Sequence, residues 1–254
     1  MTVDPDLVAA ALADTWQRLF EVAPLGWMQR EAGAFAGATG VPIATLNGIW
    51  LESRNPDGGT VAAMFDRLDA SGLPYCLQLR PGTPREITDQ ALKRGMTRGE
   101  PVPLMVLEVP TDLPAAREVE GLNVRVLEPD DIAVHVQIAA GVFGVPEELF
   151  ASVMTRELLR AEGLRCYVGA DGTDDVTTGM GVTLGSGVGV FNVATLAPYR
   201  GRGYGAAITA RVVSDALSAG AEWAWLQSSP AGYRVYERLG FVTVERWDCF
   251  ASRV

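Results

Sequence analysis

Apolar residues recur along this chain at two spacings, which predict helices in some segments and strands in others. Near the N-terminus, Val8, Leu12 and Trp16 are four residues apart and predict an amphipathic helix. Asp4 and Pro5 precede this stripe and predict the helix start, because Asp caps free N–H groups and Pro fits the first helical turn. We interpret the stripe as core packing and not as a functional site.

The first half of the chain contains several further segments of this kind. Strands are predicted over 41–46, 48–51, 75–79 and 103–109, and helices over 60–70 and 85–94, with Gly72 and Gly95 as helix ends. Residues 111–120 carry several charges close to Pro110 and Pro114, which is typical of a linker. We therefore place a domain boundary near residue 118 and predict two domains, 1–118 and 119–254.

The second half of the chain is predicted to mix strands and helices without strict alternation. Strands are expected over 122–127, 164–170, 176–184, 187–196 and 222–228 and from Val242, and helices from Pro129, over 146–159, from the turn at 199–206 to Gly220, and over 232–239. The resulting order, β-α-α-β-β-β-α-β-α-β, predicts an α+β fold built on a mixed sheet.

The segment 199–206, which reads Tyr-Arg-Gly-Arg-Gly-Tyr-Gly-Ala, lies between a predicted strand and a predicted helix. Glycines let the main chain approach an anion closely, and the free N–H groups of a helix start attract negative charge. Arg200 and Arg202 could then bind anion oxygens from either side. The segment therefore predicts a phosphate-binding turn.

A dinucleotide-binding fold is one alternative for this turn, because Gly201, Gly203 and Ala206 fit the pattern G-x-G-x-x-G/A. In that fold the strand leads directly into the first glycine, whereas three residues intervene here. The acidic partner would end the next strand, whereas Glu222 begins it, and too little chain follows for the remaining strands. These observations disfavour the dinucleotide alternative.

With a different spacing, Arg200, Gly203 and Gly205 match R-x-x-G-x-G/A, the coenzyme A signature of the GNAT superfamily of N-acetyltransferases. The run 195–205 also resembles the family's T-L-P-x-Y-R-G-x-G-x-G, with the proline displaced by one position. Residues 236–241 (Y-E-R-L-G-F) resemble a second GNAT hallmark, a tyrosine one helical turn before a Gly-Phe step. Two hallmarks about 30 residues apart are more specific than either alone.

The resemblance covers residues 119–254, and the first half more faintly resembles the degenerate N-terminal domain of tandem GNAT proteins. It implies the GNAT acyl-CoA N-acyltransferase fold in two tandem GNAT-like domains. The halves also echo each other, because Leu77-Gln78 and Leu226-Gln227 each precede a predicted helix. Ala91 aligns with Tyr236, and the first half lacks the arginine and glycine turn. If the chain arose by duplication, only the second copy kept the chemistry.

The resemblance implies acetyl-CoA as a co-substrate and assigns roles to particular residues. The main chain of Val193, Ala194 and Thr195 would bind the pantetheine arm as an added strand does. Ser229 would face the cofactor or, alternatively, only cap a helix. The pyrophosphate would be held by the turn residues Arg200, Gly201, Arg202, Gly203, Tyr204, Gly205 and Ala206, with the side chain of Tyr204 used for packing.

The implied reaction is direct attack of a neutral amine on the acetyl thioester, with the N–H of Val193 or Thr195 donating to the carbonyl oxygen. Tyr236 would donate a proton to the departing thiolate. A phenol of pKa ~10 is a weaker acid than a thiol of pKa ~8.5, so complete proton transfer to the thiolate is unfavourable. A hydrogen bond from Tyr236 that stabilises the thiolate is the alternative to proton transfer. The alternative for Tyr236 is an ordinary half-buried helix residue.

No general base is evident from the sequence. His135 is the only histidine, and a lone histidine next to apolar neighbours is more often structural than catalytic. Cys76, Cys166 and Cys249 show neither metal-ligand spacing nor a disulfide pattern, so we interpret them as reduced core thiols and expect no metal.

Composition narrows the function classes further. The chain has 254 residues, with 31 acidic and 21 basic side chains and a formal charge of −10, which disfavours nucleic acid and anionic membranes as partners. There is no basic n-region and no apolar run near ~18 residues, so we expect a cytoplasmic protein without a membrane span.

The leading hypothesis is an acetyl-CoA-dependent N-acetyltransferase with a small-molecule or peptide amine as acceptor. The acidic balance favours a cationic acceptor. A non-catalytic acyl-CoA binding or regulatory module is the alternative. Acceptor identity and oligomeric state stay open, with a homodimer as one option.

Overall fold

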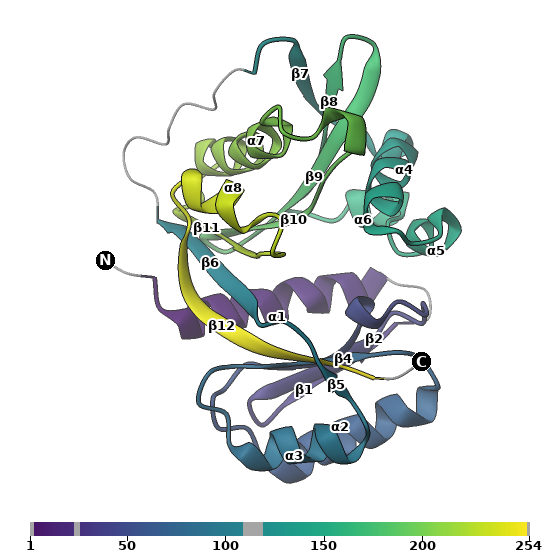
Figure 1. Cartoon of the computed structure of the whole chain (residues 1–254), viewed down its shortest axis with the longest axis vertical. Helices are drawn as coiled ribbons and strands as arrows, with labels where there is room; N and C mark the ends of the chain where they lie inside the picture. The colour runs from purple at the N-terminus through teal and green to yellow at the C-terminus, as the bar shows by residue number, and fades with distance from the viewer. Residues whose placement is uncertain (1–2, 23–25, 109–118, 253–254) are drawn as a thin grey trace. The chain divides into compact units, whose positions relative to one another are not determined.

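The computed structural model describes residues 3–22, 26–108 and 119–252 (Figure 1). The chain divides into two compact units. The N-terminal unit comprises the described residues of 4–104 and 243–252, and the C-terminal unit comprises Val3 and those of 105–242. The predicted α+β class with a mixed sheet is confirmed, since parallel and antiparallel strand pairs occur in both units.

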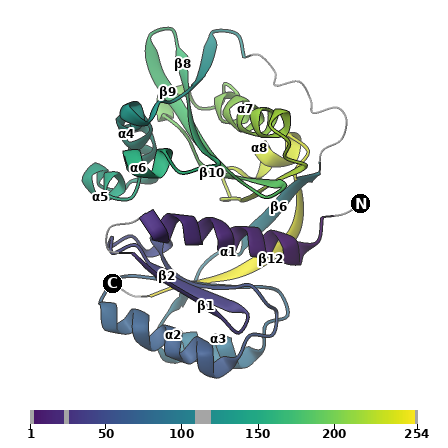
Figure 2. The same ribbon diagram turned by 180° about the vertical axis from the view of Figure 1, so that it is seen from behind.

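The N-terminal unit is a sheet with helices on both faces. Its strands run in the order β1-β2-β3-β4-β12, with β5 paired to β12. Helix α1 covers one face and helices α2 and α3 the other, as both views show (Figures 1 and 2). The helices are α1 (Pro5–Val22), α2 (Gly58–Ser71) and α3 (Arg85–Lys93), and the strands are β1 (Trp27–Glu31), β2 (Ala34–Ala38), β3 (Asn47–Leu51), β4 (Cys76–Leu79), β5 (Thr97–Arg98) and β12 (Val242–Ala251).

Local sequence signals explain how these helices begin and end. The carboxylate of Asp4 accepts a hydrogen bond from the N–H of Asp6, and the first helical bond joins Val8 to the Asp4 carbonyl. Helix α2 ends at Gly72 in the left-handed region, with φ of 66°, as its position predicted. The Trp16 ring of the predicted stripe packs 4.6 Å from that of Trp50, measured between ring centroids. The N-terminal stripe is therefore core, as predicted.

The strand predicted over 41–46 is wrong, because this segment contains a 3-10 turn at Ala44–Leu46. The buried side chain of Asn47 explains the difference: its amide donates to the carbonyls of Val41 and Ile43, at 2.8 and 3.1 Å, which a strand would offer to a neighbour. The hairpin of β1 and β2 was not predicted, because all five residues of β2 are buried and show no period-2 alternation.

The C-terminal unit is also a sheet between two layers of helices. Its strands run in the order β6-β11-β10-β9-β8-β7, with β6 (Val102–Glu108) contributing from Met105 onward. Helices α7 and α8 lie on one face and helices α4, α5 and α6 on the other (Figures 1 and 2). The strands are β7 (Leu122–Val126), β8 (Leu164–Asp171), β9 (Asp174–Leu184), β10 (Gly187–Thr195) and β11 (Trp223–Gln227), and the helices are α4 (Ile132–Phe143), α5 (Glu147–Ala151), α6 (Arg156–Leu159), α7 (Tyr204–Ser218) and α8 (Tyr233–Arg238).

Helix α7 lies close to the sheet because β9 presents glycines to it. A Cβ built on Gly179 would lie 2.5 Å from Ile208, and one built on Gly181 would lie 2.7 Å from Val212. These distances leave no room for a side chain, so the two glycines determine how closely the helix approaches the strand. This packing places the N-terminus of α7 near the end of β10.

The helix predicted over 146–159 is wrong in one respect, because the structure has two short helices, α5 and α6. Thr155 separates them: its backbone is extended, and its hydroxyl accepts a hydrogen bond from the N–H of Leu158 at 3.2 Å. A Thr with these properties is an N-cap, which starts a new helix rather than continuing the old one.

The two strands that end the halves of the chain each join the sheet that is built mainly by the other half. Strand β6 follows β5 in sequence but lies beside β11, and strand β12 follows α8 but pairs antiparallel with β4, for example through Phe250 and Leu77. The boundary near residue 118 lies outside the described residues, and the domain assignment 1–118 and 119–254 stays a prediction. The compact units are formed by exchange of the two strands between the halves of the chain.

Candidate active site

Strands β10 and β11 of the C-terminal unit pair at one end and separate at the other. Among the described residues, the parallel register runs only from Gly187 to Gly189 on β10. Beyond it, β10 has a register shift between Phe191 and Ala194, and Asn192 has a positive φ of 52°. The rings of Phe191 and Trp225 pack edge to face, with 5.3 Å between their centroids. A bulge of this kind bends the strand locally, and β10 pairs with β9 again from Ala194 onward.

The main-chain groups of β10 after the bulge point alternately toward β9 and away from it. The N–H of Leu196 donates to the Val176 carbonyl at 3.0 Å, and the Thr177 hydroxyl donates to the Ala194 carbonyl at 2.9 Å. Because successive residues of a strand alternate, the N–H groups of Val193 and Thr195 point away from β9. The binding of the pantetheine arm by the main chain of Val193, Ala194 and Thr195 stays a prediction.

The turn between β10 and α7 has the geometry of an anion-binding loop. Gly201 and Gly203 have φ of 79° and 87°, values that residues other than glycine rarely adopt. The first bond of helix α7 joins the N–H of Ala207 to the carbonyl of Gly203 at 3.0 Å. The N–H groups of Tyr204, Gly205 and Ala206 precede that bond, so they have no partner within the helix.

The two arginines of the turn have different partners. Arg200 donates from Nε to the Thr195 carbonyl at 3.0 Å, which ties it to the end of β10. Arg202 donates from Nη1 to Asp171 Oδ2 at 2.9 Å. The hydroxyl of Tyr204 donates to the same oxygen at 2.7 Å, and this side chain is buried, as its predicted packing role requires.

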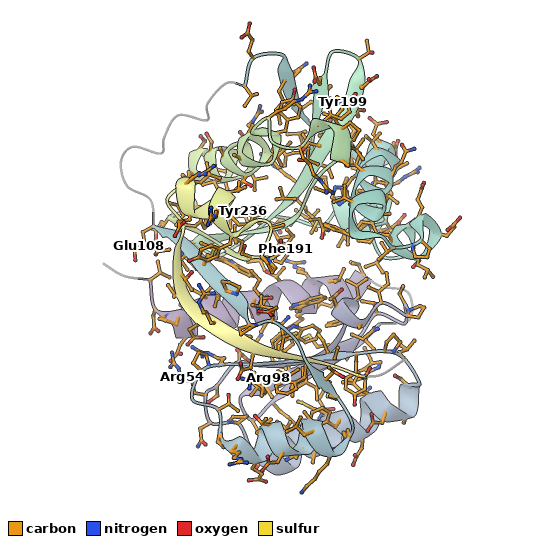
Figure 3. All side chains as sticks on the ribbon, viewed as in Figure 1. Arg54, Arg98, Glu108, Phe191, Tyr199 and Tyr236 are labelled. Atoms are coloured by element: carbon orange, nitrogen blue, oxygen red, sulfur yellow. The ribbon has the colours of Figure 1, made fainter. Side chains whose placement is uncertain are left out.

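Tyr236 lies on α8, on the same side of the sheet as α7, and Figure 3 labels it there. Its ring packs against the hydrophobic core cluster that contains Ile208 of α7. Val193 of β10 packs against the same cluster. A Cβ on Gly232 would lie 2.8 Å from the Tyr236 ring, so this glycine makes space for it. Burial raises the pKa of the Tyr236 hydroxyl to about 12.

Ser229 follows β11 and shapes the turn into α8. Its hydroxyl accepts a hydrogen bond from the N–H of Gly232 at 3.2 Å, and its carbonyl accepts from Tyr233 at 3.1 Å. This is the helix-capping alternative for Ser229. The predicted contact with a cofactor stays a prediction.

His135 on α4 is buried and neutral. Its Nδ1 lies 2.7 Å from the Thr178 hydroxyl, which itself donates to the Tyr167 carbonyl at 2.8 Å. The hydroxyl proton is thereby committed, so Nδ1 carries the imidazole proton. Burial lowers the pKa of His135 to about 4. Within the described part of the chain, its Nε2 has no hydrogen-bond partner.

The three cysteines are free, and none has the properties of a nucleophile. Burial raises the pKa of the Cys76, Cys166 and Cys249 thiols, which keeps them protonated. Across residues 3–22, 26–108 and 119–252, no three His, Cys, Asp or Glu side chains form a cluster that could hold a metal ion.

The N-terminal unit repeats the order of these elements with different chemistry. Strand β4 pairs parallel with β3, as β11 does with β10, and Arg80 follows β4 where Ser229 follows β11. The guanidinium of Arg80 is 1% exposed and donates to the Glu52 carbonyl and the Glu245 carboxylate. At the start of α2, Asp57 accepts from the N–H of Thr60 at 2.7 Å. A carboxylate therefore stands at this helix start.

Sequence reasoning missed two features of the site. The bulge at Asn192 has no local signature, because it depends on how β10 pairs with β9. Asp171 and Asp174 belong to no motif in the sequence, yet they bind the tyrosines of the glycine turn about 30 residues later. No periodicity connects residues so far apart in the chain.

Comparison with known proteins agrees with this geometry. Residues 142–241 match the model of the acetyltransferase (GNAT) family, which includes the separated strands, the glycine turn and Tyr236. Residues 142–241 therefore form a domain of the GNAT acetyltransferase family, and the fold of the chain is that of tandem GNAT proteins. A domain of this family indicates an acyltransferase. No curated protein matches the chain.

Solved structures similar to this chain have GNAT folds at low sequence identity. A GCN5-related N-acetyltransferase from Kribbella flavida has a TM-score of 0.73 at 18% identity, covering 98% of this chain and 95% of its own. A second, from Sphaerobacter thermophilus, has a TM-score of 0.64 at 18% identity, with coverages of 87% and 76%. A tandem GNAT protein from the clavulanic acid biosynthesis pathway has a TM-score of 0.60 at 11% identity, with coverages of 99% and 96%.

Among the described residues, no helix is both long enough and apolar enough to cross a bilayer.

Proposed function

We propose that this protein is an acetyl-CoA-dependent N-acetyltransferase whose C-terminal unit acetylates a primary amine by direct attack. The observation that carries the proposal is the combination of two features in one unit. Strand β10 separates from β11 after Gly189, and the main chain then enters a turn with glycines at positive φ before α7. A ligand with amides at one end and a pyrophosphate at the other would match both features.

The residues of the turn and of β10 fit coenzyme A chemically. The N–H group of either Val193 or Thr195 would donate to an amide carbonyl of the pantetheine arm, which leaves the other for the thioester. The N–H groups of residues 201–206 would donate to the pyrophosphate, with Arg200 and Arg202 adding positive charge. The exposed Ser229, at the end of β11, would lie along the same path.

Acetyl-CoA would supply an acyl group activated as a thioester. The chain's own contribution begins with donors at the carbonyl oxygen, where negative charge develops during attack, and the N–H groups of Val193 and Thr195 are the candidates. Holding the amine and the thioester together supplies a further large part of the rate.

Tyr236 would stabilise the departing thiolate. With a pKa of about 12, its hydroxyl stays protonated at neutral pH and can donate. The same value makes complete proton transfer unfavourable, so a hydrogen bond is its proposed contribution. The acceptor is proposed to be a small-molecule or peptide amine, with the formal charge of −10 favouring a cationic one.

The test is a thiol-release assay with acetyl-CoA and a panel of amines, together with calorimetric titration of coenzyme A. In Gly203→Glu, a carboxylate would occupy the proposed phosphate site, and we expect at least about a tenfold loss of coenzyme A affinity. Gly220→Glu is the matched control, because it places the same charge at the other end of α7, also at positive φ and with open space around it.

Three outcomes separate the alternatives. Retained affinity in Gly203→Glu would show that the turn does not bind the cofactor. Tight binding of coenzyme A without thiol release for any amine would favour a binding module over an enzyme. Absence of binding in the unmodified protein would contradict the proposed function altogether.

A further inference from the structure

The hairpin of β8 and β9 ends in two aspartates that face each other. Asp171 is the last residue of β8, Asp174 is the first of β9, and the two are paired in the antiparallel register. Gly172 makes the tight turn between them, with φ of 63°. Both carboxylates are thus presented at one end of the sheet by a rigid element.

These two carboxylates bind the turn that precedes α7 at both of its ends. Tyr199, before the glycines, donates to Asp174 Oδ2 at 3.1 Å, and Tyr204, after them, donates to Asp171 Oδ2 at 2.7 Å. Figure 3 labels Tyr199 at this end of the hairpin. The guanidinium of Arg202 pairs with Asp171 and lies 5.3 Å from the centre of the Tyr199 ring.

The turn needs such support because its own residues provide little. Gly201 has no heavy atom within 4 Å of a built Cβ, and Gly203 has one, a methyl group at 3.7 Å. Two glycines in three residues leave many backbone conformations accessible, and selecting one of them costs conformational entropy. A turn held at both ends loses less entropy when it binds a ligand.

The charges of the hairpin argue for positioning rather than for direct binding. A carboxylate next to a pyrophosphate would repel it, but the charge of Asp171 is compensated by Arg202 at 2.9 Å. The buried Tyr204 has its hydroxyl on the same carboxylate oxygen. Asp171 therefore contributes to the site through the two residues that it holds.

We propose that the β8–β9 hairpin positions the cofactor turn: Asp171 and Asp174 hold Tyr204 and Tyr199 so that the N–H groups of residues 201–206 are arranged for the pyrophosphate of coenzyme A. This inference rests on the proposed function for its ligand, but not for the arrangement of the free turn. Asp171 and Asp174 are positioning residues, and neither touches the reacting atoms.

The test compares Asp171→Ala, Asp171→Asn and Tyr204→Phe. We expect Asp171→Ala and Tyr204→Phe to raise the coenzyme A Kd and the acetyl-CoA KM about threefold to tenfold with kcat unchanged, the size of one lost hydrogen bond. Asp171→Asn keeps an oxygen for the Tyr204 hydroxyl and should recover most of the affinity. Asp175→Ala is the matched control, because Asp175 lies on the same hairpin but pairs with Arg125, at 2.6 and 2.8 Å.

Hydrogen exchange of the ligand-free protein gives a readout that needs no cofactor. The amides of residues 201–206 should exchange several-fold faster in Asp171→Ala and at the normal rate in Asp175→Ala. Unchanged exchange, or coenzyme A affinity that is equal or higher in Asp171→Ala, would overturn the positioning role. Lack of coenzyme A binding by the unmodified protein would instead contradict the proposed function and the ligand, while the exchange rates would still decide whether the hairpin holds the turn.

Discussion

The environment of Tyr236 determines which version of its chemistry is available. The ring packs in the space above Gly232 and against Phe241, with 6.0 Å between the ring centroids of Tyr236 and Phe241. Burial disfavours the phenolate, so the hydroxyl proton is retained far above neutral pH. A hydroxyl with this pKa donates a hydrogen bond but does not transfer its proton at neutral pH.

Tyr236→Phe removes only this hydroxyl and tests its role. We expect kcat to fall at least about tenfold, because a hydrogen bond to a charged leaving group is worth about 1.5–3 kcal/mol, with the coenzyme A Kd unchanged. Since the pKa is about 12, ionisation of Tyr236 should cause no loss of activity in the unmodified enzyme up to about pH 10. Steady-state kinetics over this pH range makes the measurement.

The control for Tyr236→Phe is Tyr75→Phe, which removes a hydroxyl that donates to Asp69 at 2.6 Å in the N-terminal unit. It should leave kcat unchanged. If Tyr236→Phe also retains full kcat with a saturating acceptor, Tyr236 is a packing residue and the proposed role is wrong.

At the scale of elements, the two units differ at their parallel strand pairs. The N-terminal unit has a buried ionic network next to β3 and β4, whereas β10 and β11 of the C-terminal unit separate after Gly189. Arg80, after β4, donates to Glu245 of β12 at 2.8 and 3.0 Å and to Asp6 of α1 at 2.6 Å. Trp247 also donates to Glu245, at 2.7 Å. The network joins a helix and two strands, and its central charges are almost fully buried.

Removal of Arg80 should therefore destabilise the protein strongly. Arg80→Met removes two hydrogen bonds to the buried Glu245 carboxylate and leaves it with Arg54, at 2.6 Å, and Trp247. We expect a loss of more than about 1.5 kcal/mol in the free energy of unfolding. Arg98→Met is the control, because the ion pair of Arg98 with Asp248 is exposed and should contribute less than about 1 kcal/mol. Urea denaturation measures both, and equal effects of the two substitutions would contradict the importance of the buried network.

At the scale of the whole molecule, the two units share an order of elements but differ in what they can bind. Both contain a parallel strand pair connected by a helix, as β3-α2-β4 and as β10-α7-β11. In the C-terminal unit α7 starts with free N–H groups, whereas Asp57 caps the start of α2. A carboxylate at that place would repel a pyrophosphate.

The chain should consequently bind one coenzyme A. Calorimetric titration of the full chain is expected to give a single site per chain, and Gly203→Glu should weaken binding at that site at least about tenfold. A second equivalent of coenzyme A, or binding that survives Gly203→Glu with unchanged affinity, would show that the N-terminal unit also holds the cofactor.

Features that depend on neighbours along the chain were predictable from the sequence. The cap at Asp4, the helix end at Gly72 and the turn with Gly201 and Gly203 each follow from the conformational preferences of one residue and its nearest neighbours. Predictions failed where distant contacts override such preferences, as at Asn47, whose side chain binds the loop carbonyls that a strand would need.

By itself, the sequence determined the class of fold, the order of most elements, and a glycine turn and a tyrosine with the spacing of the GNAT superfamily. Each of these features depends on residues that lie close together in the sequence. Only the tertiary structure decided that β6 and β12 are exchanged between the halves of the chain, that β10 separates from β11, and that Asp171 and Asp174 hold the turn. These strand pairs and hydrogen bonds join residues 25 or more positions apart, and a local pattern of hydrophobic and polar residues does not specify such partners.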